Sequence, residues 1–217
     1  MNEEQKLRLD LLGACGYNIE AARKCLEFVR GGDKDKKQES VCDRLVDGIY
    51  LINKYEEIVP FDGKEKIGIG LVTHIGIVQG NRSLAISLHD VSEKEVALTA
   101  NKDKKYYGGY KDEYMDAVQD WDGKENTERL KQIGLAIELE DGEYIPALAE
   151  LYLMCLNQKA INEAMRFVGG QELNDHYWSS TEFNATEAWG LNFIEGYANN
   201  LNKANITTKV RPVKKLL

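Results

Sequence analysis

Two groups of residues in this sequence have side chains suited to acid–base chemistry. His89 and Asp90 are adjacent, and an imidazole oriented by a carboxylate is one part of a catalytic dyad. No nucleophile motif accompanies the pair. A histidine at the end of a strand followed by an aspartate in a turn would give the same sequence pattern without any catalytic role. The second group is a set of carboxylates around Gly142, where a general acid and base, a cation site and a solvated turn are competing interpretations. Its members are Glu138, Glu140, Asp141 and Glu143.

The cysteines and histidines do not have the spacing of a metal site. The cysteines are Cys15, Cys25, Cys42 and Cys155, and the histidines are His74, His89 and His176. No Cys-x-x-Cys pair occurs, and with so few cysteines in 217 residues we expect reduced thiols and not a disulfide framework. Nucleotide-binding and hydrolase motifs are also missing, since the glycine-rich run at 67–72 lacks the third glycine of a dinucleotide site. We therefore expect no catalytic residue, no metal and no cofactor.

The C-terminal segment differs from the rest of the chain in amino-acid composition. Seven of the fifteen asparagines lie in the last 44 residues, where an even spread would give about three. One interpretation is local, because asparagine suits turns and left-handed backbone. The other is a presented polar surface, because aromatic and amide side chains together make adaptable binding surfaces. Both interpretations remain open from the residues alone.

The charge and hydropathy of the chain restrict its partners. The net charge is -8 and there is no basic stripe, which argues against nucleic acid, because neutralisation of phosphates supplies most of that affinity. No stretch reaches the length of a membrane span, so we expect no direct membrane insertion. The first residues lack the pattern of a secretory signal. We expect synthesis in the cytoplasm, with display on a virion, surface display by a non-classical route, or a signal trimmed from this sequence.

Hydrophobic periodicity divides the chain into two parts. Residues 1–40 predict a helical appendage and a polar linker, suited either to attachment or oligomerisation or to packing on the main domain. Residues 47–217 begin with short β-rich runs up to Leu88 and continue with helices near 114–121, 126–133, 148–155 and 160–168. The end, 171–217, alternates β-prone runs with asparagine-rich loops. Strands, then helices, then a loop-rich β end predict an α+β domain.

Several short motifs of this domain resemble the Lcl C-terminal domain family. They are Asp122-Gly123-Lys-Glu-Asn-Thr127, Glu143-Tyr-Ile-Pro146 with Ala149-Glu150-Leu151, Tyr177-Trp-Ser-Ser-Thr-Glu182, Ala188-Trp189, Gly196 and Val210-Arg-Pro-Val213. The resemblance covers roughly residues 47–217 and is densest in the last eighty. That family has the C-type-lectin-like fold shared with the formylglycine-generating enzyme, and the resemblance implies this fold here.

The same end of the chain is also similar to the variable proteins of diversity-generating retroelements. In those proteins a rigid fold holds varied side chains on one exposed face, and phage receptor-binding is the known use. The resemblance implies a binding surface at Asn174, Asp175, His176, Phe183, Asn184, Thr186, Asn192, Tyr197, Asn199, Asn200, Asn202 and Asn205. It implies a framework of Trp178, Ser179, Ser180, Thr181, Trp189, Gly196, Arg211 and Pro212. The tryptophans would supply core area, the serines would bond loop backbone, and Arg211 would pair with a buried carboxylate or carbonyl.

Two departures from related folds limit what the resemblance implies. The calcium-binding sequence motifs of sugar-binding C-type lectins are missing, so we expect calcium-independent binding. The cysteine pair of the formylglycine-generating enzyme is missing from this end, so we expect no enzyme. The function predicted is an adhesin or receptor-binding protein for a cell-surface protein or glycan, in a homo-oligomer or a larger particle. The alternative is a structural subunit of a surface fibre, pilus or phage particle.

Overall fold

The computed structural model describes residues 45–64, 70–100 and 109–216. Their fold is α+β, with two antiparallel sheets and four helices in the described residues, as the order of strand and helix patterns predicts. Leu45–Leu217 makes up one compact unit, and this unit contains all of the domain predicted for residues 47–217.

Some of the predictions fall on residues that the structure does not describe. The helical appendage at 1–40, the glycine-rich run at 67–69 and three of the four cysteines lie outside the described residues. Cys155, the fourth, is a free and half-buried thiol on a helix, and its burial raises its pKa.

The first sheet has five strands in the order β2-β1-β3-β4-β8. These are β1 (Gly48–Asn53), β2 (Ile58–Pro60), β3 (Val72–Gln79), β4 (Arg82–Ser87) and β8 (Val213–Lys214). The turn predicted at Gly80 joins β3 to β4, and Gly80 has a φ of 59° that favours glycine. Alternate residues of β3 point to opposite faces, so Ile75 and Ile77 enter the main core while Val78 joins a smaller cluster on the outer face.

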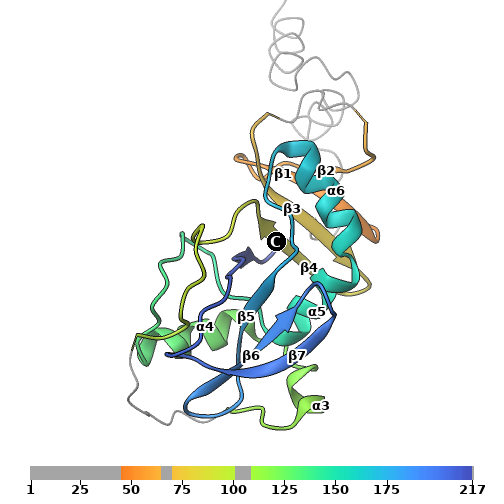
Figure 1. Cartoon of the computed structure of the whole chain (residues 1–217). Coiled ribbons are helices and arrows are strands. Elements are labelled where there is room, and N and C mark those ends of the chain that lie inside the picture. The colour runs from red at the N-terminus through yellow and green to blue at the C-terminus, as the bar shows by residue number, and fades with distance from the viewer. Residues whose placement is uncertain (1–44, 65–69, 101–108, 217) are drawn as a thin grey trace, which may run out of the picture. The chain divides into compact units, whose positions relative to one another are not determined.

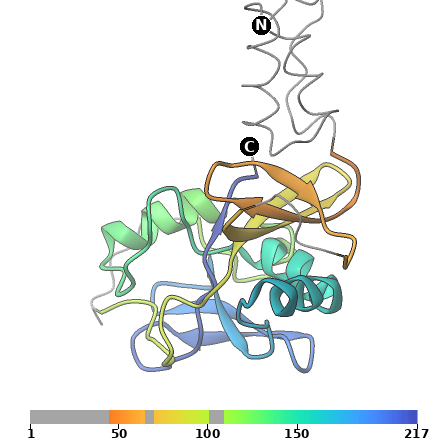
Figure 2. The ribbon, with the colours of Figure 1, turned by 90° about the horizontal axis from the view of Figure 1, so that it is seen from above.

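Two consecutive helices pack the main core. They are α5 (Leu148–Leu156), which follows Pro146 as predicted, and α6 (Gln158–Val168), which ends at left-handed Gly169. In the first sheet β1 and β3 pack against α6, and in the second sheet β5 and β6 pack against α5. Figures 1 and 2 show the two sheets at opposite ends of the unit, with α5 and α6 along one side and α4 on the other.

The two helices before α5 differ from the sequence prediction. The first, α3 (Tyr114–Ala117), ends earlier than the predicted Trp121, and the second, α4 (Gly123–Gln132), starts earlier than the predicted Asn126. The difference arises because Asn126 does not cap the helix: its amide lies inside α4 and donates to the carboxylate of Asp120. Gly123 begins the helix in a crowded place, where a Cβ atom would lie 2.7 Å from the backbone nitrogen of Ala147.

The second sheet has three strands in the order β5-β6-β7. They are β5 (His176–Glu182), β6 (Glu187–Asn192) and β7 (Tyr197–Asn202). The sequence prediction of an asparagine-rich loop over β7 is wrong. All six of its residues pair with β6, from Glu187 opposite Asn202 to Asn192 opposite Tyr197, because backbone pairing outweighs the low β propensity of asparagine.

Both faces of the second sheet are covered over part of their area. Tyr177, Trp189 and Leu191 point into the main core beside α5. On the other face, Trp178 and Ala188 join a separate apolar cluster that includes Leu98, Leu130 and Val210. Side chains exposed on this sheet are therefore confined to its edge strand β7 and to its turns.

Candidate ligand-binding site

The residues predicted as framework begin with four fully buried positions on β5. Trp178 donates its indole N–H to the carbonyl of Val96 across 2.9 Å. Ser180 donates its hydroxyl to the carbonyl of Gly123, and the hydroxyl of Ser179 accepts the N–H of Thr181. The Thr181 hydroxyl accepts the backbone N–H of Leu148 and so holds the first turn of α5 against the sheet.

A buried carboxylate lies beneath this strand, and the sequence analysis did not identify it. Asp120 accepts hydrogen bonds at 2.8 Å from the Thr181 hydroxyl and from the Asn126 amide. Its other oxygen accepts the backbone N–H of Asp122 at 3.1 Å. Three donors satisfy one buried charge, and they join β5 to α4 and to the segment between α3 and α4. The motif that resembles the Lcl C-terminal domain family begins at Asp122, so no sequence signal marked Asp120.

A second buried carboxyl belongs to Glu150, in the first turn of α5. Its oxygens accept the backbone N–H of Ala147 at 2.8 Å and the Tyr144 hydroxyl at 3.0 Å. Burial raises its pKa to about 7, and the negative charges of Asp120 and Asp122 act in the same direction. The two hydrogen bonds oppose this rise. Glu150 therefore changes protonation near neutral pH inside the framework.

The C-terminal framework residue Arg211 is fully buried. Its guanidinium donates to the carboxylate of Asp90 at 2.8 Å and to the carbonyls of Ser87 and Gln171. The structure thus gives Arg211 both kinds of partner that the resemblance implied. Asp90, half of the His89–Asp90 pair considered for catalysis, also accepts the side-chain amide of Gln171. Its carboxylate is therefore engaged in the framework.

The neighbouring framework positions lie at strand and turn ends. The carbonyl of Pro212 accepts the backbone N–H of Ser87, which pairs the chain with β4 just before β8. Gly196 closes the turn between β6 and β7 with a φ of 73°. Trp189 donates its indole N–H to the carbonyl of Lys111 at 2.8 Å, which fixes the segment leading into α3.

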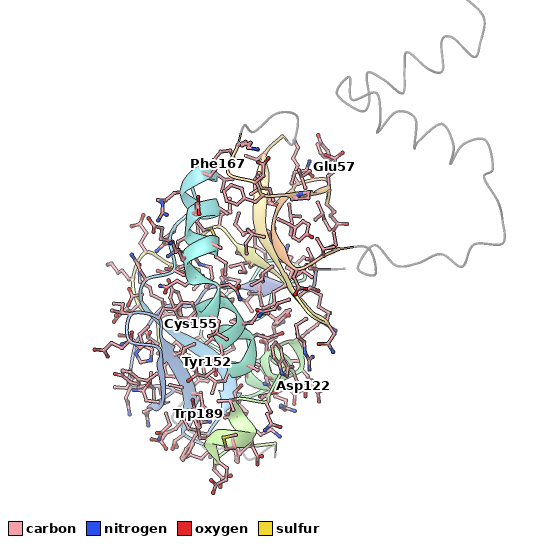
Figure 3. The ribbon with its side chains drawn as sticks, turned by 90° about the vertical axis from the view of Figure 1, so that its right-hand side faces the viewer. Glu57, Asp122, Tyr152, Cys155, Phe167 and Trp189 are labelled. Carbon is pink, nitrogen blue, oxygen red and sulfur yellow. The ribbon has the colours of Figure 1, made fainter. Side chains whose placement is uncertain are left out.

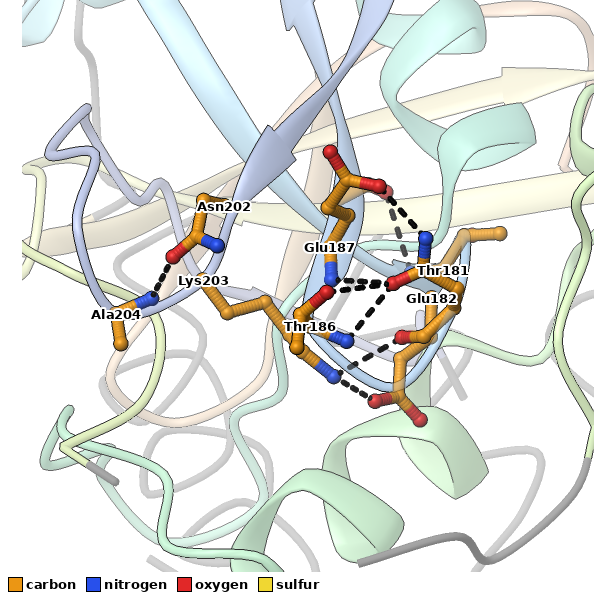
Figure 4. Close-up of polar contacts among 9 residues, drawn as sticks. Thr181, Glu182, Thr186, Glu187, Asn202, Lys203 and Ala204 are labelled. Atoms are coloured by element: carbon orange, nitrogen blue, oxygen red, sulfur yellow. Dashed lines mark hydrogen bonds and ion pairs between the residues drawn. The ribbon is translucent and has the colours of Figure 1, made fainter. Parts of the chain in front are cut away.

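Three of the predicted binding asparagines cap turns. The side-chain oxygen of Asn184 accepts the N–H groups of Thr186 and Glu187, and that of Asn192 accepts those of Ile194 and Glu195. The side-chain oxygen of Asn202 accepts the N–H groups of Ala204 and Asn205. Figure 4 shows the first and third of these turns around the buried Lys203, which pairs with Glu182. The local interpretation of asparagine as a turn residue therefore accounts for these three positions.

The predicted positions on the strands divide between the two faces of the second sheet. His176, Asn192, Tyr197 and Asn199 lie on the face that carries Trp178. His176 stands over Gly190, where a Cβ atom would come within 2.9 Å of its Nε2, and burial lowers the pKa of its imidazole. Asn200 and Asn202 lie on the opposite face, with Trp189.

The remaining positions lie in turns and connections. Asn174 and Asn205 are exposed, while Thr186 is half-buried in the turn between β5 and β6. Asp175 accepts the N–H of His176 at the start of β5. The twelve predicted positions therefore do not share a single face, and their role in binding remains a prediction.

One surface brings aromatic side chains and an exposed asparagine together, and we call it the aromatic–asparagine face. It consists of Tyr114, Tyr152, Phe183 and Asn200, which lie around the buried Trp189. Asn200 on the edge strand pairs directly with Trp189. The ring of Trp189 contacts Phe183 and Tyr114 in edge-to-face geometry, with centroids 5.4 Å and 5.9 Å apart.

The two tyrosines of this face come from helices distant in the sequence. The hydroxyls of Tyr114 on α3 and Tyr152 on α5 are hydrogen-bonded at 2.8 Å, and the Tyr152 hydroxyl lies beside the backbone of Ala198 in β7. Figure 3 shows Trp189 and Tyr152 at the end of the unit where α3 lies. Sequence analysis missed both tyrosines, since only the tertiary fold brings them to the edge of β7.

Of the carboxylates around Gly142, Glu138, Glu140 and Asp141 are exposed, and Glu143 is half-buried. Gly142 has a φ of 77°, and the N–H of Glu143 bonds the carbonyl of Glu140. Within residues 45–64, 70–100 and 109–216, no three histidine, cysteine or acidic side chains group as metal ligands. Over the same residues no helix has the length and apolar character needed to cross a membrane.

Comparison with known proteins adds no relative to this description. No family model, no curated protein and no solved structure matches the chain. The site is therefore interpreted from its own geometry.

Proposed function

We propose that this chain is a ligand-binding protein with a C-type-lectin-like scaffold, and that it binds through the aromatic–asparagine face without catalysing a reaction. The observation that carries the proposal is the contrast within the second sheet. In its interior the buried side chains of Trp178, Ser180 and Thr181 are hydrogen-bonded, whereas Asn200 on its edge strand and Tyr114 beside that edge are exposed. A rigid support under exposed aromatic and amide side chains limits the entropy lost on binding.

The composition of the face favours a protein or glycan on a cell surface as the ligand. Tyrosine offers a large, rigid contact area with a polar tip, and such residues supply much of the binding energy in protein interfaces. Asparagine adds a donor and an acceptor beside them. Weak binding by one such face would be strengthened by display of many copies on an oligomer or particle.

The resemblance to retroelement-diversified proteins gives this proposal a genetic test. The locus would be sequenced in several isolates, together with any near-copy of codons 174–211 that differs at adenines. We expect substitutions at exposed positions such as Asn174, Asn200 and Asn205, and we expect the turn-capping Asn184, Asn192 and Asn202 to be spared. Loss of the comparable cap at a helix N-terminus costs about 1 kcal/mol, and we expect a cost of that order at these turns.

Two outcomes of the sequencing count against diversification. One is the lack of any near-copy, which would leave a binding protein of fixed specificity. The other is variation that falls equally on capping and exposed asparagines, which would mean that turn capping by Asn184, Asn192 and Asn202 does not constrain the binding surface.

A further inference from the structure

A pocket of about 280 Å³ opens on the outer face of the first sheet, and none of its lining residues belongs to the aromatic–asparagine face. Its apolar lining comes from Ile52 on β1, Ile58 on β2, Ala85 on β4 and Leu216 after β8. The volume is near the lower limit for ligand pockets, so it suits a molecule of roughly ten non-hydrogen atoms.

His74 on β3 lines this pocket with an unsatisfied ring nitrogen. Its Nδ1 lies 3.0 Å from the Thr73 hydroxyl, which itself donates to the carbonyl of Ile52. When the Thr73 hydroxyl donates to Ile52, its oxygen accepts from His74, and Nδ1 is then the ring nitrogen that carries the proton. The other nitrogen, Nε2, is then an acceptor; it is buried and has no hydrogen-bond partner among the described residues. Burial lowers the pKa of the His74 imidazole. The positive charge of Lys214 lowers this pKa further, and the negative charge of Glu143 opposes the shift.

The charged lining of the pocket has an excess of cations. Three lysines (Lys54, Lys214 and Lys215) stand against two carboxylates (Glu56 and Glu140). Glu143 lies nearby, but its oxygens accept the Ser87 hydroxyl and the N–H of Glu140. Among the described residues, neither Lys214 nor Lys215 forms an ion pair.

We propose that this pocket binds a small hydroxy acid with an apolar body. The carboxylate would pair with Lys214, and the body would lie on Ile52, Ala85 and Leu216. The hydroxyl would donate to Nε2 of His74, which a shift of the ring must first open to the pocket. Each group of such a ligand satisfies one feature of the pocket: an unpaired ammonium, an unpaired acceptor and an apolar wall. The proposal is independent of the function proposed for the other sheet.

The test uses the full chain and the three isomeric hydroxybenzoates, which have ten non-hydrogen atoms each, as probes. Nitrogen NMR of the histidine rings at pH 7.5 first establishes the tautomer of His74, and each probe is then titrated. We expect at least one isomer to shift the His74 Nε2 resonance in a saturable way. Benzoate, which lacks the hydroxyl, and hydroxybenzyl alcohol, which lacks the charge, should each bind at least tenfold more weakly.

The variant Lys214→Met should weaken the best probe at least tenfold, whereas Lys159→Met, an exposed lysine on α6, should leave its affinity unchanged. Spectra of both variants without probe establish that the fold is retained. The proposal is overturned if no isomer shifts His74 in the wild-type chain, or if His74 carries its proton on Nε2. It also fails if benzoate binds as well as the best hydroxybenzoate, or if the two lysine variants behave alike.

Discussion

Replacing Arg211 with methionine is expected to lower the free energy of unfolding by about 3–5 kcal/mol, because it leaves a buried carboxylate without its cation. The side chains of Arg211 and Asp90 are 0% and 1% exposed, and their polar atoms are 2.8 Å apart. The guanidinium also joins the segments after β4, before β5 and before β8 through carbonyls and Asp90. Its loss therefore weakens the link between the two sheets. Denaturant unfolding of both proteins measures the difference.

Arg166→Met is the matched control for this prediction. Arg166 pairs with Glu172 at 2.5 Å, but its side chain is 56% exposed, so its loss should cost less than about 1 kcal/mol. Adding Asp90→Asn to Arg211→Met should restore part of the stability, since the unpaired charge is then removed. Equal losses for Arg211→Met and Arg166→Met would show that burial does not give the Arg211 pair its structural role.

Replacing Glu150 with glutamine is expected to remove a pH dependence of stability between about pH 4.5 and 7. Burial raises the pKa of Glu150 to about 7 from an ordinary value of 4.5. Between these values the folded protein holds a proton that the unfolded chain has lost, so stability falls as the pH rises. Across this whole pH range the free energy of unfolding falls by about 3 kcal/mol. Above about pH 7 the contribution of Glu150 to the free energy of unfolding no longer changes with pH.

Glutamine matches the protonated carboxyl in shape and in hydrogen bonding. Its oxygen would accept the N–H of Ala147, and its amide would donate to the Tyr144 hydroxyl. We therefore expect Glu150→Gln to match the wild type near pH 4.5 and to exceed it by about 2–3 kcal/mol at pH 8. Glu125→Gln, at a side chain 72% exposed, should have the wild-type pH profile. If the Glu150→Gln and wild-type profiles are parallel, the carboxyl is already ionised throughout this range.

Local sequence patterns predicted several elements of this fold and failed for others. The Gly80 turn, the helix after Pro146 and the end of α6 at Gly169 were predictable, because glycine and proline restrict the backbone where they stand. β7 was missed because its pairing with β6, and not its composition, makes it a strand. The β propensity of a residue depends on its neighbours across the sheet, which a single segment does not reveal.

The same limit applies to the candidate site. Asparagine content marked both the turn caps and the exposed edge, and only the structure separates Asn184 from Asn200. The buried Asp120 and Glu150 had no local signal, since acidic residues at these spacings are mostly exposed. Tyr114 and Tyr152 meet across 38 residues of sequence. Hydrophobic periodicity in the sequence cannot predict which side chains meet through tertiary packing.

Binding by two tyrosine variants tests the proposed function most directly. Tyr114 is 46% exposed on the aromatic–asparagine face, and Tyr197 is 47% exposed on the opposite face of the second sheet. Wild type, Tyr114→Ala and Tyr197→Ala would be displayed on fluorescent beads and tested against bacterial cells and immobilised glycans. We predict saturable binding by wild type, a loss of at least tenfold for Tyr114→Ala and little change for Tyr197→Ala. Equal losses for both variants, a loss only for Tyr197→Ala, or no saturable binding by wild type would contradict the proposal.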